Sequence, residues 1–269
     1  MPEPTAPTAA RTPEVEDLWR TEDYRERWRR LLAWLAPRPG ERVLDVGFGA
    51  GETLRYLAPR LGPSGRAVGI GPSLLRAATL RQPTDGDPVP PLPLGAVAQA
   101  LPFRDGTFDA ALCVNVLEAV PAPERPLALS ELRRVLRPGG RVLLAHDDWE
   151  SHAYAGADRE LTRRCVRAYA DVRFKSYAAS DGQMGRHLWG LLRAAGFRET
   201  SLRALPLVNT EYKEPLFGWI HSRVPVDLVP PETAVTQPDV DRWHAQLAAA
   251  SDRGDYVFCG TLYVCLGRA

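Results

Sequence analysis

The sequence lacks several features that would point directly to a function. It has four cysteines in 269 residues, and their spacing forms neither a disulfide framework nor a Cys/His set for zinc. It contains no apolar run long enough to span a bilayer and no secretory leader. Its 34 basic and 33 acidic residues include no basic block, which argues against a nucleic-acid ligand. We therefore expect a cytoplasmic protein that acts on a small molecule, without a metal, nucleic acid or membrane. The sequence leaves open whether the protein forms a homodimer.

The N-terminal part divides into two segments. Residues 1–13 are rich in Pro, Thr and Ala, and we expect them to be disordered. Over residues 14–40, Trp and Leu recur among charges at helical spacing until Pro37 and Gly40 end the pattern. This segment is predicted to be a helical lid that covers a site in the following domain, residues 41–269.

Short apolar segments alternate with helical patterns after residue 41. The predicted strands cover residues 42–46, 66–70, 94–98, 108–115 and 141–145, and the predicted helices cover 52–61, 73–81 and 123–136. Crossovers of this length require parallel neighbouring strands, which predicts an α/β fold with a doubly wound, mostly parallel, Rossmann-like sheet. Pro93 cannot donate to a strand ladder, so its strand is expected at a sheet edge.

The C-terminal half is less regular. We predict helices over 158–170, 183–195 and 240–251, and extended segments over 198–208 and 256–265. The intervening stretches around 147–182 and 209–240 are expected to be insertions that cover the substrate.

A glycine-rich turn is the strongest functional signal. Residues 43–51 read Val-Leu-Asp-Val-Gly-Phe-Gly-Ala-Gly, a buried strand followed by a turn that opens a helix. Glycine lacks the Cβ that would keep a ligand away from the backbone, so this pattern is typical of a nucleotide-type cofactor site. The spacing differs from the dinucleotide fingerprint, which has a further residue before its last glycine and an acidic residue about 20 positions on. A turn without a ligand is the alternative.

Two further motifs accompany the turn. Residues 101–109 read Leu-Pro-Phe-Arg-Asp-Gly-Thr-Phe-Asp, and residues 131–140 read Glu-Leu-Arg-Arg-Val-Leu-Arg-Pro-Gly-Gly. In this order, the three motifs resemble class I S-adenosylmethionine-dependent methyltransferases, most closely the small-molecule branch related to ubiquinone/menaquinone C-methyltransferases. The resemblance implies S-adenosylmethionine as cofactor and an added antiparallel strand at the sheet edge, which residues 256–267 would supply.

The resemblance also implies a set of cofactor-binding residues. In it, Asp45 holds the ammonium side of the cofactor, and the glycines pass under its methionine and ribose. The full set is Asp45, Gly47, Phe48, Gly49, Gly51, Gly71, Ser73, Val97, Ala98 and Asn115.

Two positions depart from the family pattern. Relatives carry a carboxylate for the ribose where this chain has Gly71, and an aspartate for the adenine where it has Val97. Each lost charge-assisted hydrogen bond would cost about 1.5 to 3 kcal/mol. Cofactor binding is therefore expected to be weakened unless Ser73, Gln99 or backbone groups substitute.

Candidate catalytic residues follow the fifth predicted strand. His146 is the candidate general base, with Asp147 or Asp148 to orient it, because ligands of open α/β sheets bind at the carboxyl ends of strands. The alternative is that His146 packs at the strand end and the aspartates cap the next helix. The candidate substrate contacts, each of which could instead be a core residue, are Tyr24, Glu118, Trp149, His152, Tyr154, Tyr212 and Trp219.

Three functions are compatible with these features. The first is methyl transfer to a small, apolar or aromatic metabolite of secondary metabolism. The second is a non-methylating reaction, such as a cyclisation or rearrangement, on a fold that has lost normal cofactor use. The third is a non-catalytic partner of an active enzyme, since fold does not dictate function.

Overall fold

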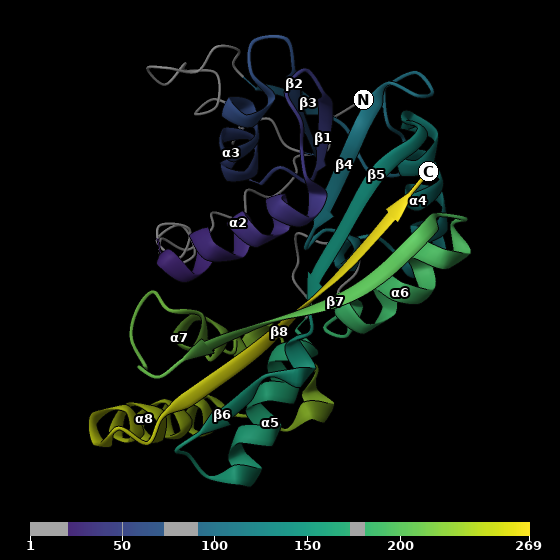
Figure 1. Ribbon diagram of the computed structural model, residues 1–269. Helices are drawn as coiled ribbons and strands as arrows, with labels where there is room; N and C mark the ends of the chain where they lie inside the picture. Colours follow the sequence, from purple (N-terminus) through teal and green to yellow (C-terminus); the bar gives the residue numbers. More distant parts are fainter. Residues whose placement is uncertain (1–20, 50, 73–90, 173–180) are drawn as a thin grey trace, which may run out of the picture.

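The computed structural model describes residues 21–49, 51–72, 91–172 and 181–269. Within these residues one eight-stranded sheet has the order β3-β2-β1-β4-β5-β8-β6, with β7 paired to β8 (Figure 1). The helix expected over 73–81 and the cofactor residue Ser73 lie outside the described residues.

The first five strands are parallel, as predicted. They are β1 (Arg42–Val46), β2 (Arg66–Gly71), β3 (Leu92–Gly95), β4 (Phe108–Val114) and β5 (Leu136–Asp147). Val46 pairs with Ile70 on one side and Cys113 on the other, so the carboxyl ends of β1, β2 and β4 meet at one edge of the sheet. The doubly wound α/β sheet is confirmed.

Two strands differ from their predicted limits. β3, which holds Pro93 at the sheet edge as expected, stops at Gly95 because its partner β2 ends at Gly71. β5 begins earlier than expected because Leu136 already pairs with Phe108, with a shift in register before Arg141.

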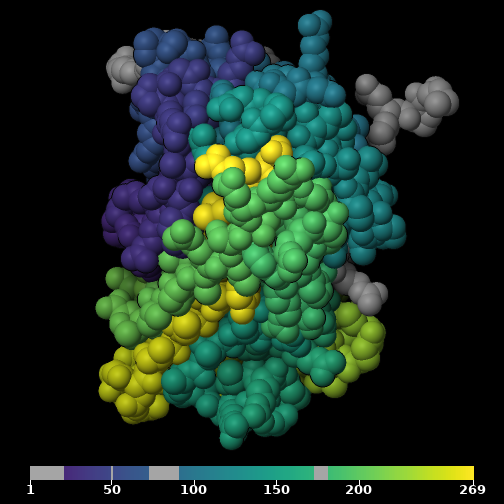
Figure 2. Space-filling view, turned by 45° about the vertical axis from the view of Figure 1, so that its right-hand side comes forward, coloured from purple at the N-terminus to yellow at the C-terminus, as the bar shows by residue number. Residues whose placement is uncertain are grey.

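The antiparallel C-terminal strand does not lie where it was expected. β8 (Val257–Arg268) is inside the sheet, with β7 (Arg198–Asn209) along one side and β5 followed by β6 (Ala153–Ala155) along the other. Its consecutive residues Val264 and Cys265 are both fully buried, which only a strand covered on both faces allows. On the face drawn in the space-filling view, the yellow C-terminal end of the chain is visible beside the green surface of β7 and α6 (Figure 2).

Helices cover both faces of the parallel strands. α2 (Glu22–Leu35) and α3 (Glu52–Leu61) pack on the face to which Val43 points, whereas α4 (Arg125–Val135) and α6 (Met184–Ala194) pack on the face of Leu44 (Figure 1). The buried side chains of α2 belong to the same core cluster as those of β1, β4, β5 and β8.

A separate aromatic layer surrounds the first half of β8. It is built from β6 and the helices α5 (Arg159–Ala170), α7 (Phe217–His221) and α8 (Gln237–Arg253), drawn at the lower end of Figure 1. α8 starts earlier than predicted because Thr236 and Asp239 form a capping box. The short 3₁₀ helices are Leu117–Ala119, Ala122–Glu124, Trp149–Ser151, Val226–Leu228 and Pro231–Thr233. Among the helices described, none has the length and apolar character needed to cross a membrane.

Candidate active site

The glycine turn is a tightly held connection between β1 and α3. Gly47, Gly49 and Gly51 have φ values of +83°, +55° and +88°, a region that favours glycine. The Gly47 amide donates a hydrogen bond to the carbonyl oxygen of Ile70 at 2.8 Å. A Cβ at Gly47 would lie 2.2 Å from a methyl group of Val116. The turn is therefore fixed against the end of β2 and the loop that follows β4.

Asp45 brings an incompletely paired carboxylate to this turn. Its side chain is buried, and its Oδ2 has no hydrogen-bond partner among the residues that the structure describes. Burial raises the pKa of Asp45 to about 7, although a hydrogen bond with the Thr53 side chain opposes the increase. Buried carboxylates are normally paired with cations. The site thus has a free acceptor that a cationic group of a ligand could use.

The other predicted cofactor residues offer few polar side-chain groups. The Phe48 ring is 4 % exposed and lies against Gly71, where an added Cβ would be 3.2 Å from the ring. Val97 is 46 % exposed and Ala98 is buried. Gln99, a candidate substitute, donates to the Glu124 carboxylate at 2.8 Å.

A second buried aspartate stands at the end of β5. The Arg27 guanidinium of α2 binds the Asp147 carboxylate through two hydrogen bonds of 2.9 Å. The Asn115 side chain donates to the same carboxylate at 3.0 Å and accepts from the Asp147 amide at 3.0 Å. Asn115 has a positive φ of 53°. Burial alone would raise the pKa of Asp147, but the Arg27 charge and the hydrogen bonds from Arg27 and Asn115 together hold this pKa below its usual range.

Arg27 was not among the predicted site residues. It is buried, and its guanidinium carbon lies 4.3 Å from the centre of the Phe217 ring of α7. The sequence does carry a signal, because Arg27 occupies the same helical stripe as the buried residues Leu31 and Leu35. A charged residue on a buried stripe requires a partner.

His146 is held by a different pair of groups from those predicted. Its Nδ1 lies 2.6 Å from the backbone oxygen of Asp147, and its Nε2 forms an ion pair with Glu118. Burial lowers the pKa of His146, but the charge and hydrogen bond of Glu118, together with the contributions of Asp147, outweigh burial, and the net effect is an increase. The carboxylates of Asp147 and Asp148 do not orient His146, because they bind Arg27 and Arg186 respectively.

Four predicted residues therefore lie together at the carboxyl ends of β4 and β5. They are Asn115, Glu118, His146 and Asp147. The Trp149 ring is next to them, 5.9 Å from the His146 ring, and on its other side contacts Tyr169 at 5.6 Å between ring centres.

Two histidines extend this cluster into the aromatic layer. The rings of His152 and His221 are 4.7 Å apart, and the Nδ1 of His221 is 3.0 Å from the Tyr169 hydroxyl. Burial lowers the pKa of His221 to about 4 and that of His152 well below its usual value. Both are neutral at neutral pH.

The remaining candidate substrate residues have structural partners. The Tyr154 hydroxyl donates to the Gly218 oxygen at 3.0 Å, and the Tyr212 hydroxyl is 2.8 Å from that of Ser222. Trp219 lies under the Arg223 guanidinium at 3.8 Å. Tyr24 stacks on Phe217 with ring centres 6.4 Å apart. Substrate contact by these residues stays a prediction.

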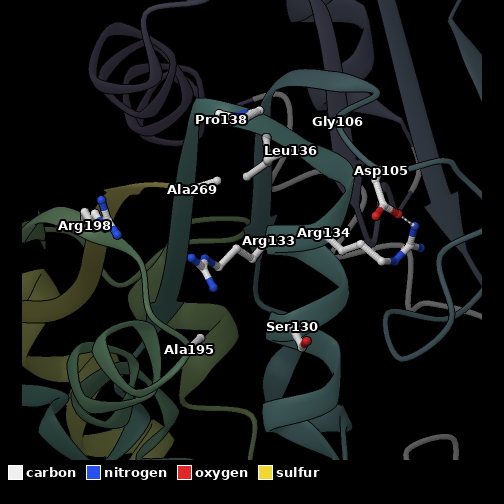
Figure 3. A pocket seen from close by; sticks show the side chains of 10 residues that line it. All are labelled: Asp105, Gly106, Ser130, Arg133, Arg134, Leu136, Pro138, Ala195, Arg198 and Ala269. Atoms are coloured by element: carbon white, nitrogen blue, oxygen red, sulfur yellow. Dashed lines mark hydrogen bonds and ion pairs between the residues drawn. The ribbon is translucent and has the colours of Figure 1, made fainter.

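An open hollow of about 690 Å³ lies at the opposite end of β5 (Figure 3). Its lining includes Arg133, Leu136, Pro138, Arg198 and Ala269. Leu136 is the first residue of β5, whereas the candidate catalytic residues follow its carboxyl end. The hollow is therefore separate from the candidate active site. Over the residues that the structure describes, no three His, Cys, Asp or Glu side chains form a group that could hold a metal ion.

The fold and the glycine turn define a doubly wound protein with a nucleotide-type site at its strand ends. Residues 44–144 match the family model described as a methyltransferase domain. A protein of Mycobacterium ulcerans named as a probable phthiotriol/phenolphthiotriol dimycocerosates methyltransferase is 31 % identical over 186 residues, which are 65 % of this chain and 69 % of that protein. The chain belongs to this methyltransferase family, which confirms the resemblance expected from the motifs.

Two other similarities delimit what the family implies. The ubiquinone/menaquinone biosynthesis C-methyltransferase UbiE of Bordetella avium is 41 % identical over 109 residues, 40 % of this chain and 41 % of that enzyme. The crystal structure of the YcgJ protein from Bacillus subtilis has the same fold, with a TM-score of 0.57, 18 % identity and coverage of 91 % of this chain and 98 % of that one. The chain spans 46 %, 41 % and 60 % of the length of the first curated relatives that it matches.

Proposed function

We propose that this protein transfers a methyl group from S-adenosylmethionine to a small, uncharged, apolar or aromatic metabolite. The observation that carries the proposal is the unpaired Asp45 carboxylate oxygen beside the glycine turn. Family membership and the matches to small-molecule methyltransferases support the same activity. Neutral His152 and His221, together with the Arg27–Asp147 pair, leave little net charge around the acceptor, which favours an uncharged substrate.

Each part of the site has a distinct role in this proposal. The cofactor supplies an electrophilic methyl group on its sulfonium. Asp45 would hold the ammonium group, and the backbone at Gly47, Gly49 and Gly51 would hold the methionine moiety. Gly71 and Val97 add no polar side chain toward ribose or adenine, so binding is expected to be weaker than two carboxylates at these positions would give.

The His146–Glu118 pair is the proposed proton acceptor for the methylated atom. Both ring nitrogens of His146 face protein oxygens, and the negative charge of Glu118 favours the protonated form of His146. A proton from the substrate can enter only after the pair has lost its own, so turnover should increase as the pH rises through the raised pKa of His146. His146→Ala should lower turnover at least tenfold with cofactor affinity unchanged.

Isothermal titration with S-adenosylhomocysteine tests the cofactor assignment. We expect binding by the intact chain and a loss of at least tenfold in affinity for Asp45→Asn, because a charge-assisted hydrogen bond contributes about 1.5 to 3 kcal/mol. Absence of heat and of a thermal shift at millimolar S-adenosylmethionine and S-adenosylhomocysteine would overturn it.

A non-methylating reaction is the second candidate. It is favoured by Gly71 and Val97, since neither position retains a polar side chain for the nucleoside. S-adenosylhomocysteine release during turnover distinguishes the two, because only methyl transfer produces it in proportion to product. The non-methylating reaction would leave S-adenosylmethionine unchanged.

A further inference from the structure

Arg27 retains an unsatisfied hydrogen-bond donor in the interior of the protein. Its side chain is 6 % exposed, and its two terminal nitrogens both bind Asp147. Its Nε is buried and has no hydrogen-bond partner within the described part of the chain. Such an orphan donor is unfavourable and calls for an explanation, because nearly all buried polar groups are paired.

The aromatic ring of Phe217 lies against the guanidinium that carries this donor. The guanidinium carbon lies 4.3 Å from the centre of the Phe217 ring. The Tyr24 ring stacks on Phe217 with ring centres 6.4 Å apart, and its centre is 6.1 Å from that of the Trp28 ring. The Phe217 ring supplies apolar surface and no acceptor, and no oxygen of the described residues, the Tyr24 hydroxyl included, binds Nε. A ligand that satisfied Nε here would place an oxygen atom next to a flat apolar surface.

The charge of Arg27 is already compensated by Asp147. The carboxylate binds both terminal nitrogens, and Asn115 fixes the carboxylate in turn. A second anion beside this pair would meet the Asp147 charge in a buried setting, where like charges repel strongly. The partner of Nε is therefore a neutral oxygen, such as a ketone or hydroxyl group.

We infer that Arg27 positions the methyl acceptor by donating its Nε hydrogen to a carbonyl or hydroxyl oxygen of an uncharged aromatic substrate. This inference rests on the proposed function and specifies its substrate class. The N-terminal helix α2 then contributes a specificity-determining residue to a site otherwise built at the ends of β4 and β5. Asp147 and Asn115 act through Arg27 as positioning residues, because they hold the guanidinium in place.

The test uses three probes of equal ring size: 1-naphthol, naphthalene and 1-naphthoate. Their dissociation constants are measured on the full chain by tryptophan fluorescence or ligand-observed NMR. We expect 1-naphthol to bind at least tenfold more tightly than either of the others, since a hydrogen bond from a charged donor is worth about 1.5 to 3 kcal/mol. Equal binding of the three, or preference for 1-naphthoate, would overturn the inference.

Arg27→Lys isolates the Nε donor. Lysine places a methylene group where Nε stands and keeps a positive charge for Asp147. The preference for 1-naphthol over naphthalene should fall to less than threefold, whereas Arg30→Lys, a change at an exposed residue of the same helix, should leave it intact. A retained tenfold preference in Arg27→Lys would contradict the assignment.

The outcome is separable from that of the cofactor experiment. Probe affinities are measured with and without S-adenosylhomocysteine, and Asp45→Asn serves as the variant that weakens only the cofactor. Failure to bind S-adenosylhomocysteine with the 1-naphthol preference intact would overturn the proposed function alone. Cofactor binding without that preference would overturn only the role of Arg27. Circular dichroism of Arg27→Lys checks that the variant is folded.

Discussion

The ends of β1 and β5 carry the same residue in opposite electrostatic states. Asp45 and Asp147 are 2 % and 3 % exposed, and both lie toward the carboxyl edge of the sheet. Asp147 binds a guanidinium and an amide, and its pKa falls below the usual range. Among the described residues, Asp45 has the Thr53 hydroxyl as its one partner, and burial raises its pKa to about 7. One carboxylate is satisfied within the chain, whereas the other is left for a cation from outside.

This difference separates a carboxylate whose charge is paired within the protein, where it links two elements, from one whose charge is left for a ligand. A pKa change from 3.8 to about 7 corresponds to about 4 kcal/mol of unfavourable free energy for ionised Asp45. A bound ammonium group would relieve this cost. The Asp147 charge needs no such ligand, because Arg27 ties it to α2 instead.

The largest expected effect comes from removing the cation that pairs with Asp147, so that this carboxylate, like that of Asp45, has no cation beside it. Arg27→Met leaves the Asp147 charge buried without a cation, and we expect the free energy of unfolding to fall by about 3 to 5 kcal/mol. Urea denaturation at neutral pH measures the change.

Two variants control this experiment. Arg30→Met removes an exposed ion pair with Glu26 on the same helix and should cost less than about 1 kcal/mol. The double variant Arg27→Met/Asp147→Leu removes both buried charges and should regain most of the lost stability. If Arg27→Met behaved like Arg30→Met, the Arg27–Asp147 pair would not be the structural link described above.

Some features of the fold were predictable from the sequence and others were not. The helix over 52–61 and the strand over 42–46 were predicted with their observed bounds, because periodicity and glycine punctuation are local signals. The place of β8 inside the sheet was not, since strand pairing depends on residues more than a hundred positions away. Local sequence patterns do not indicate which of several distant strands will pair with one another.

In the site too, the positions of residues were predictable and their partners were not. Asp45, Asn115, His146 and Asp147 were placed at strand ends by topology, and they do lie there. Their partners were not predictable, because Arg27 is 120 residues from Asp147 in the chain. The pairing of His146 with Glu118, in place of a neighbouring aspartate, depends on the short helix after β4.

Removing the charge of Asp45 should have opposite effects on binding and stability. Asp45→Asn eliminates the carboxylate that binds the ammonium group, and S-adenosylhomocysteine affinity should fall about 10- to 100-fold. The free energy of unfolding of the ligand-free variant should rise at pH 8, because a buried uncompensated charge is gone. Calorimetry and urea denaturation measure the two effects.

Asp147→Asn is the matched variant for this prediction. It leaves the Arg27 charge buried without its partner, so the free energy of unfolding should fall. The same substitution would thus stabilise the protein at one strand end and destabilise it at the other. Destabilisation by both changes would show that Asp45 is already paired.

The pH dependence of the two ends should also differ. Folded Asp45 holds its proton more tightly than the unfolded chain does, so its contribution to stability is fully present below pH 3.8 and is lost as the pH rises through about 7. The ligand-free protein should lose stability between pH 6 and 8, and S-adenosylhomocysteine affinity should increase about tenfold over the same range. Asp147 has a lowered pKa and adds no slope there.

The contribution of His146 to the pH dependence of stability must be separated from that of Asp45. The raised pKa of His146 makes a contribution of the same sign, lost as the pH rises through the folded value. The part due to Asp45 is the difference between the unmodified chain and Asp45→Asn. Parallel pH profiles for these two proteins would assign the whole slope to other groups.

The smallest expected effect concerns Thr53, whose side chain is the partner that Asp45 does have. Thr53→Val preserves the shape of this buried residue but removes a hydrogen bond that lowers the Asp45 pKa, so that pKa should rise further. The midpoint of the pH profile of S-adenosylhomocysteine binding should move upward by less than about one pH unit, since one hydrogen bond contributes about 0.5 to 1.5 kcal/mol. Thr162→Val deletes a buried hydroxyl that accepts from Trp243 in the aromatic layer, and it should leave the midpoint in place. A downward shift in Thr53→Val would mean that the Thr53 hydroxyl stabilises the protonated carboxyl, and the unpaired state of the ionised Asp45 would then have to be explained without it.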